Sequence, residues 1–188
     1  MSIVTKTGDA GSTALMFNRR VPKSHPRVEA GGCVDELNAA LGLARATAEQ
    51  TFLREHLLVI QKALVIVMGE LATLVEDLPR FVEAGFSRVT PELTAKLDEL
   101  VKQIEAQNIS PKDWAMPGTT MNSAALDFAR TICRRAERQV CALQESRQLQ
   151  NPELMIYLNR LSDTLWLLAR WVEARKAADV KGIGGSGS

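Results

Sequence analysis

The chain has 188 residues, of which 46% are hydrophobic and 24% are charged. This length and composition predict one globular domain of soluble type with a sizeable core. The formal net charge of +1 argues against a general nucleic-acid binder, because such proteins carry a broad basic excess.

Cysteine and histidine are both scarce. Three cysteines, an odd number, form no Cys-x-x-Cys pair, which indicates a reducing compartment and buried thiols rather than disulfides or a zinc site. The N-terminus shows no signal-peptide pattern, and charged residues interrupt the apolar-rich segment 57–78. We therefore expect a cytoplasmic protein with no membrane partner.

In chain order, residues 1–26 have the glycine, proline and threonine content of turns and loops. Helical apolar spacing then predicts five helices, over residues 27–47, 51–75, 91–107, 121–147 and 152–178. Segments 80–89 and 110–120 are predicted to be loops. Pro26, Thr90-Pro91 and Asn151-Pro152 are typical of helix starts.

This pattern predicts an all-α fold, a five-helix antiparallel bundle with an irregular N-terminal arm. We expect residues 1–181 to form a single domain, with the arm over 1–26 and the bundle over 27–178. Residues 182–188 are rich in glycine and serine and are expected to form a flexible tail or linker.

The N-terminal stretch Thr5-Lys6-Thr7-Gly8-Asp9-Ala10-Gly11-Ser12-Thr13 has the chemistry of a phosphate-binding loop. Glycines let backbone N–H groups turn toward an anion, and the hydroxyls and Lys6 add donors. It lacks the Gly-Lys-Ser/Thr ending of a Walker A motif. A flexible arm is the alternative interpretation, in which the nearby Lys23 is an ordinary surface lysine.

Helix 121–147 carries a dense polar stripe. At 100° per residue, Arg130, Arg134 and Glu137 share one face, with Asp127 and Arg138 at its margin. Arginine pairs bidentately with phosphate or carboxylate, so the stripe predicts a site for a polyanion. The alternative is a solvated face held by weak i,i+3 and i,i+4 ion pairs.

Two further polar residues lie on helical faces that otherwise suit packing. Asp35 shares a side of helix 27–47 with small residues, and a buried carboxylate there needs a partner. An arginine of helix 121–147, in this chain or a neighbouring one, is the main candidate, and direct catalysis is the lesser alternative. Asn159 suits a ribose, phosphate or base edge, or it ties two helices together.

Four blocks of the sequence, in matching order and spacing, resemble the PduO-type ATP:cob(I)alamin adenosyltransferases over about residues 3–178. The blocks are Thr5 to Thr13, Pro26 to Ala30 running into Val34 to Asn38, Arg130 to Arg138, and Tyr157 to Asp163. The resemblance implies a homotrimeric five-helix bundle with active sites between subunits. It also implies that cob(I)alamin attacks the 5′ carbon of ATP, giving adenosylcobalamin and triphosphate.

The same resemblance implies roles for residues of this chain. The ATP-binding residues would be Thr5, Lys6, Thr7, Gly8, Asp9, Gly11, Ser12, Thr13, Lys23, Arg134, Arg135, Glu137, Arg138 and Asn159. The catalytic group would be Arg130, Arg134, Glu137 and Asp35, with Arg130 and Asp35 forming an interface ion pair. The corrinoid would contact Trp114 and Met116.

The resemblance further implies Mg²⁺, held mainly by the ATP phosphates, with its protein ligands unassigned. A reductase is a candidate partner. Four positions, Ala10, Gly31, Thr119 and Asp127, depart from the family pattern and bear on ATP affinity or corrinoid fit. Two other functions fit the same residues: a non-catalytic ATP or corrinoid sensor or carrier, and a helical interaction protein.

Overall fold

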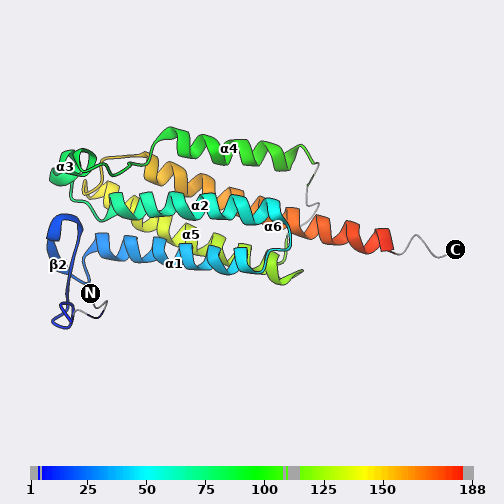
Figure 1. Cartoon of the computed structure of the whole chain (residues 1–188), viewed down its shortest axis with the longest axis horizontal. Helices are drawn as coiled ribbons and strands as arrows, with labels where there is room; N and C mark the ends of the chain where they lie inside the picture. Colours follow the sequence, from blue (N-terminus) through cyan, green and yellow to red (C-terminus); the bar gives the residue numbers. More distant parts are fainter. Residues whose placement is uncertain (1–3, 5, 108, 110–114, 184–188) are drawn as a thin grey trace.

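The computed structural model describes residues 4, 6–107, 109 and 115–183, with side chains up to residue 178. The elements are β1 (Ser12–Ala14), η1 (Met16–Asn18), β2 (Arg20–Pro22), α1 (Pro26–Ala46), α2 (Thr51–Leu71), η2 (Val75–Asp77), α3 (Leu78–Glu83), α4 (Pro91–Glu105), α5 (Met121–Glu145) and α6 (Glu153–Ile183). The five long helices run along the longest axis of the molecule (Figure 1).

These helices form the predicted bundle. α1 packs against both α2 and α5, α5 packs against α6, and α4 covers α6. Their apolar stripes meet in one core, in which side chains such as Leu37, Leu64, Leu126 and Leu158 are completely buried. Helical amphipathicity of this kind is what drives such packing. The all-α prediction is therefore confirmed.

Local sequence explains where two of the site-bearing helices begin. Thr120 Oγ1 accepts a hydrogen bond from Ser123 N over 2.9 Å, and Ser123 Oγ accepts one from Thr120 N over 3.1 Å, so a capping box opens α5. Asn151 Oδ1 accepts from Glu153 N over 3.1 Å at the start of α6. The predicted cap at Asn151 is therefore confirmed.

The structure differs from the sequence prediction after α2. The helix ends at Leu71 rather than at residue 75, and the chain bends by 109° into η2 and α3. α3 occupies part of the segment predicted as a loop, where Phe81 is buried against Gly69 and stacks on Phe86. Six residues are too few to show helical periodicity in a sequence. At the far end, α6 extends to Ile183, beyond the predicted end at 178.

The N-terminal arm contains a short antiparallel hairpin, with Ser12 opposite Pro22 and Ala14 opposite Arg20. Arg19, next to β2, forms a bidentate ion pair with Asp77 of η2, with N–O distances of 2.7 and 2.8 Å. This contact fixes the hairpin at the end of the bundle where α5 ends and α6 begins (Figure 1).

Candidate functional site

The glycine-containing arm is organised around Arg20. Its Nη2 donates to the carbonyl of Thr7 over 2.9 Å and also to Ser12 Oγ. Gly11 has φ +77°, a left-handed conformation that favours glycine, and its carbonyl accepts from Lys23 N over 2.9 Å. These contacts fold the predicted phosphate-binding loop back onto β2.

Gly8 and Lys23 lie against each other. A Cβ atom at Gly8 would lie 3.2 Å from both Cε and Nζ of Lys23, so the absence of a side chain at Gly8 makes room for the lysine. The predicted loop and the predicted lysine are thus brought together. Lys6, Thr7 and Asp9 are exposed and Ser12 and Thr13 half-buried, while Thr5 lies outside the described residues.

The second group of predicted residues lies on α5 and α6. Arg134 and Arg138 are exposed, and Glu137 is half-buried beside them. Asn159 Nδ2 of α6 donates to Glu137 Oε1 over 2.9 Å. Asn159 therefore ties two helices together, as one of its two interpretations predicted, and it does so within the arginine stripe.

Two other predicted residues have partners on α1 or α5. Arg135 forms an ion pair with Glu36 of α1, so its guanidinium points away from Glu137 toward the neighbouring helix. Arg130 Nε donates to Asp127 Oδ1 over 3.2 Å. Asp35 is exposed on α1, and the ion pairs among the described residues do not join it to Arg130. A partner for Asp35 in another copy stays a prediction.

The thiol of Cys133, on α5, is not a nucleophile. Cys133 is completely buried, and its Sγ donates to the carbonyl of Leu158 over 3.2 Å. Burial raises the pKa of the Cys133 thiol far above its usual range, and the nearby Glu137 raises it further. Burial likewise raises the pKa of Tyr157. Neither Cys133 nor Tyr157 therefore provides an activated thiolate or phenolate.

The predicted corrinoid residues are only partly described. Trp114 lies outside the described residues, and Met116 is 73% exposed in the segment that leads into α5. A hollow of about 280 Å³ lies beside the same helix start, lined by residues that include Thr120, Asn122, Val172 and Lys176. A larger apolar groove of about 480 Å³ runs between α2 and α4 and contains none of the predicted site residues.

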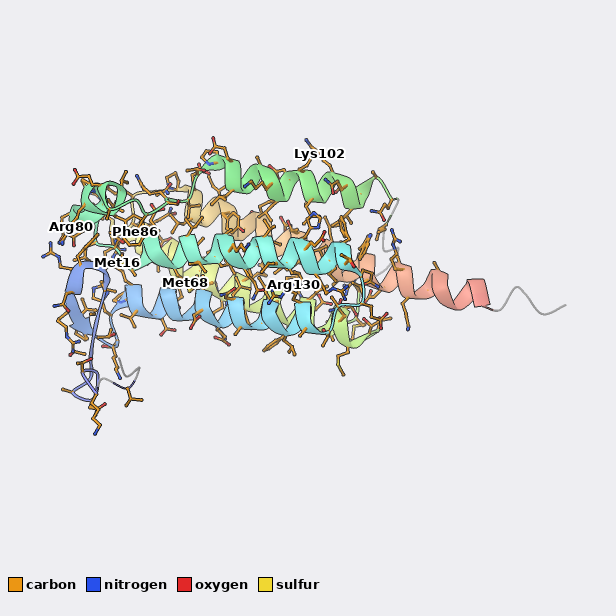
Figure 2. The ribbon with its side chains drawn as sticks, viewed as in Figure 1. Met16, Met68, Arg80, Phe86, Lys102 and Arg130 are labelled. Atoms are coloured by element: carbon orange, nitrogen blue, oxygen red, sulfur yellow. The ribbon has the colours of Figure 1, made fainter. Side chains whose placement is uncertain are left out.

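Figure 2 shows Arg130 well away from the end of the bundle where Met16 and Arg80 lie. In the part of the chain that the structure describes, no cluster of three His, Cys, Asp or Glu side chains could hold a metal ion. Nor is any single helix there long and apolar enough to cross a membrane, although the bent pair Thr51–Leu71 and Val75–Glu83 meets that test by length and composition.

Sequence reasoning missed the contacts that organise both groups. Arg20 was not singled out, although it forms a pair of adjacent arginines with Arg19, six residues after the end of the glycine loop. Arg170 was missed as well. It donates over 2.6 Å to Asp127, one of the four residues that depart from the family pattern. The sequence feature that could have identified Arg170 is a single charged residue in the otherwise apolar run Trp166 to Trp171. This residue lies in helical register with Asn159 and Asp163.

A sequence profile of the cobalamin adenosyltransferase family matches residues 3–172. The chain is 39% identical to a corrinoid adenosyltransferase of Citrobacter freundii, covering 89% of this chain and 93% of that protein. It is 40% identical to the corrinoid adenosyltransferase PduO of Salmonella typhimurium, covering 90% of this chain but 49% of that longer protein.

A solved structure also resembles the chain. It is a variant PduO-type ATP:corrinoid adenosyltransferase from Lactobacillus reuteri, complexed with cobalamin and ATP. The TM-score is 0.82 at 34% identity, over 94% of this chain and 96% of the other. With the profile match and the relatives in agreement on one family over nearly the whole length, the chain belongs to the cobalamin adenosyltransferases.

Proposed function

We propose that this protein transfers the 5′-deoxyadenosyl group of ATP to the cobalt of cob(I)alamin, giving adenosylcobalamin and inorganic triphosphate. The observation that carries the proposal is the membership of the chain in the cobalamin adenosyltransferases over residues 3–172. The cobalamin and ATP bound to the Lactobacillus reuteri relative support it. The hydrogen bond from Asn159 to Glu137 joins two of the sequence blocks expected to bind the nucleotide.

The chemistry suits a site without a protein nucleophile. Cob(I)alamin attacks C5′, the C5′–O bond breaks, and the electron pair leaves with the triphosphate. The protein must therefore hold both reactants in line and stabilise the anion that departs. Arg134 and Arg138 are exposed on the stripe and are proposed to bind the triphosphate. Lys6, Lys23 and the loop N–H groups would bind it from the arm.

The proposed Mg²⁺ would arrive with ATP, because this ion keeps several waters and binds mainly through substrate phosphates and few carboxylates. It would offset part of the charge of the triphosphate. The arginines of the stripe would then contact the remaining phosphate oxygens.

We further propose a homotrimer with sites between subunits. One observation favours shared sites: the carboxylate of Asp35 is exposed on α1 and therefore accessible to a second copy. The arm of one copy would complete the arginine stripe of the next, with Asp35 meeting Arg130 across the interface. Trp114 and Met116 would contact the corrinoid. In this proposal residues 1–181 form the working domain of a cytoplasmic enzyme, and a reductase is a candidate partner.

The reaction can be tested directly. Purified protein is mixed anaerobically with ATP, Mg²⁺ and chemically reduced cobalamin, and the visible spectrum is followed. We expect the cob(I)alamin band to convert to a light-sensitive alkylcobalamin with release of triphosphate. ATP binding without conversion would favour a sensor or carrier instead. Neither binding nor conversion would leave the helical interaction protein.

A matched pair of variants tests the site. Arg134→Ala is expected to lower kcat/KM by about a hundredfold, on the scale of lost anion-binding donors. Lys102→Ala removes the same charge from the outer side of α4 (Figure 2) and should leave kcat/KM unchanged. A loss of less than about threefold in Arg134→Ala would contradict its role.

A further inference from the structure

A seam of mostly polar side chains lies between α5 and α6. We define it by Asp127, Arg130, Arg134 and Glu137 of α5 and by Asn159, Asp163, Trp166 and Arg170 of α6. Within each helix the residues recur every three or four positions, which places them on one face. Asn159 contacts Glu137 at one end and Arg170 contacts Asp127 at the other, as expected for antiparallel helices.

The two ends of the seam differ in burial. Arg134, Asn159 and Asp163 are exposed, whereas the side chains of Asp127 and Arg170 are each only 4% exposed. The seam thus begins in the proposed nucleotide site and ends inside the protein.

The buried end is a balanced group of two acidic and two basic side chains. Arg170 Nη2 donates to Asp127 Oδ2 over 2.6 Å and to Glu173 Oε1 over 3.1 Å. Arg130 Nε donates to Asp127 Oδ1 over 3.2 Å. The carboxylate of Asp127 therefore accepts from two arginines, one through each oxygen. A buried carboxylate is tolerated when it is compensated in this way.

The hydrogen bond to Asp127 leaves part of the Arg130 guanidinium available to bind another group. Its side chain is 26% exposed, and of its nitrogens only Nε takes part in a hydrogen bond given for the described residues. The guanidinium has five N–H donors, so the four on Nη1 and Nη2 remain for a carboxylate or phosphate. An arginine already held at Nε loses less side-chain entropy when it binds such a group.

We propose that Asp127, with its charge offset by Arg170, positions Arg130 for the adenosyl transfer by accepting the hydrogen bond from Arg130 Nε. Asp127 and Arg170 are positioning residues, which act through Arg130 and touch neither substrate. Because Arg170 makes the shorter bond to Asp127, it offsets the carboxylate charge that would otherwise hold Arg130 inward. This proposal rests on the proposed function, since Arg130 is placed in that site.

The test replaces the buried pair while keeping the fold. Asp127→Leu with Arg170→Met removes both charges together, which is often neutral for stability. Asp127→Asn with Arg170→Met also removes both charges but keeps a side-chain oxygen that can accept from Arg130 Nε. We expect the Leu/Met protein to lose about tenfold in kcat/KM, and the Asn/Met protein to recover most of that loss. Cooperative thermal unfolding of both variants checks the fold.

A double-mutant cycle separates positioning from a merely structural role. In an Arg130→Lys background the same Leu/Met change should alter kcat/KM by less than about twofold, because the side chain it acts through is already changed. Slow exchange of the Arg130 Nε–H in nitrogen-15 NMR spectra should persist in the Asn/Met protein. It should be lost in the Leu/Met protein.

The outcomes are distinguishable. Wild-type protein that converts no cob(I)alamin would overturn the proposed function, and the positioning role with it. Wild-type turnover together with equal activities of the Leu/Met and Asn/Met proteins would overturn the positioning role alone. If the Leu/Met change lowered kcat/KM as much in the Arg130→Lys background as in wild type, the positioning role would also be overturned. The Leu/Met protein could fail to fold, in which case the Asn/Met protein alone decides. An Asn/Met activity far below that of wild type would then contradict the proposal if the exchange of the Arg130 Nε–H is still slow.

Discussion

The amide of Asn159 donates a hydrogen bond to the carboxylate of Glu137 over 2.9 Å. This contact joins two sequence blocks and orients both side chains at the exposed end of the polar seam. Asn159→Asp replaces the donor with a second negative charge. The new carboxylate would repel both Glu137 and a bound triphosphate.

We therefore expect Asn159→Asp to weaken ATP binding by about tenfold, which corresponds to about 1.4 kcal/mol. Titration calorimetry with Mg²⁺ and ATP measures this change. Gln103→Glu adds the same charge on exposed α4 and serves as the control, with unchanged affinity. If Asn159→Asp bound ATP as tightly as the control, Asn159 would be a link between helices and nothing more.

The contact between Gly8 and Lys23 gives a second prediction. In Gly8→Ala the new methyl group would lie 3.2 Å from Lys23 Cε and Nζ, so the flexible lysine must move and its ammonium is displaced. We expect KM for ATP to rise a few-fold with little loss of stability. Steady-state kinetics should also show that Gly8→Ala adds nothing in a Lys23→Ala background, because both changes act through the same ammonium.

Gly42→Ala is the matched control. Its Cβ would make ordinary contact, 3.5 Å from Gln61 Nε2, in the interior of α1. It is expected to stabilise the fold by about 0.5–1 kcal/mol without altering KM, because glycine weakens a helix interior relative to alanine. A rise in KM for Gly42→Ala equal to that of Gly8→Ala would show that the effect is not local to the loop.

The sequence was sufficient to predict the five long helices, because each carries a sustained apolar stripe. It also placed Arg130, Arg134 and Glu137 on one face, since that follows from helical geometry alone. The register between α5 and α6 could not be read in the same way. Pairing Arg170 with Asp127, 43 positions apart in sequence, depends on how two helices slide against each other when the core packs.

Two kinds of feature were harder to predict: short elements, and ion pairs that could form either within the chain or between subunits. α3 has six residues, and its position depends on the packing of Phe81 against Gly69 rather than on a repeat. Asp127 was placed at the margin of the arginine stripe, yet its carboxylate holds Arg130 within the chain. That contact is an ordinary i,i+3 pair, and no sequence pattern distinguished it from a pair between subunits.

Glu70 gives a prediction about stability. Its carboxylate, 1% exposed, accepts from Arg88 Nε and Nη2, from Asn151 Nδ2 and from the backbone N–H of Val89, all within 3.0 Å. These bonds connect α2 to the segment before α4 and to the cap of α6. In Glu70→Gln the new amide NH₂ would face one of these donors in either orientation.

Glu70→Gln is therefore expected to lower the free energy of unfolding by about 3 kcal/mol, the scale of breaking a buried ion pair. Urea denaturation measures the change. Glu55→Gln, at an exposed position of the same helix, should change it by less than about 0.5 kcal/mol. Equal values for the two variants would mean that the bonds to Glu70 add no net stability.

The ion pair of Arg19 with Asp77 predicts how stability depends on pH. The hydrogen bond from Arg19 lowers the pKa of the Asp77 carboxyl below its ordinary value of 3.8. A carboxyl group with a lowered folded pKa binds fewer protons in the folded than in the unfolded protein at acid pH. Its contribution to stability is therefore fully present above pH 3.8 and is lost as the pH falls through the folded pKa.

We expect Asp77→Asn to unfold at lower urea concentration than wild type at neutral pH, and the two midpoints to converge as the pH falls below 3.8. Arg19→Gln should reproduce this convergence, because it removes the other half of the pair. Glu55→Gln, which has no such contact among the described residues, should instead follow the wild-type curve in parallel. A constant gap between Asp77→Asn and wild type from neutral to acid pH would show that Asp77 stabilises the hairpin by packing rather than by its charge.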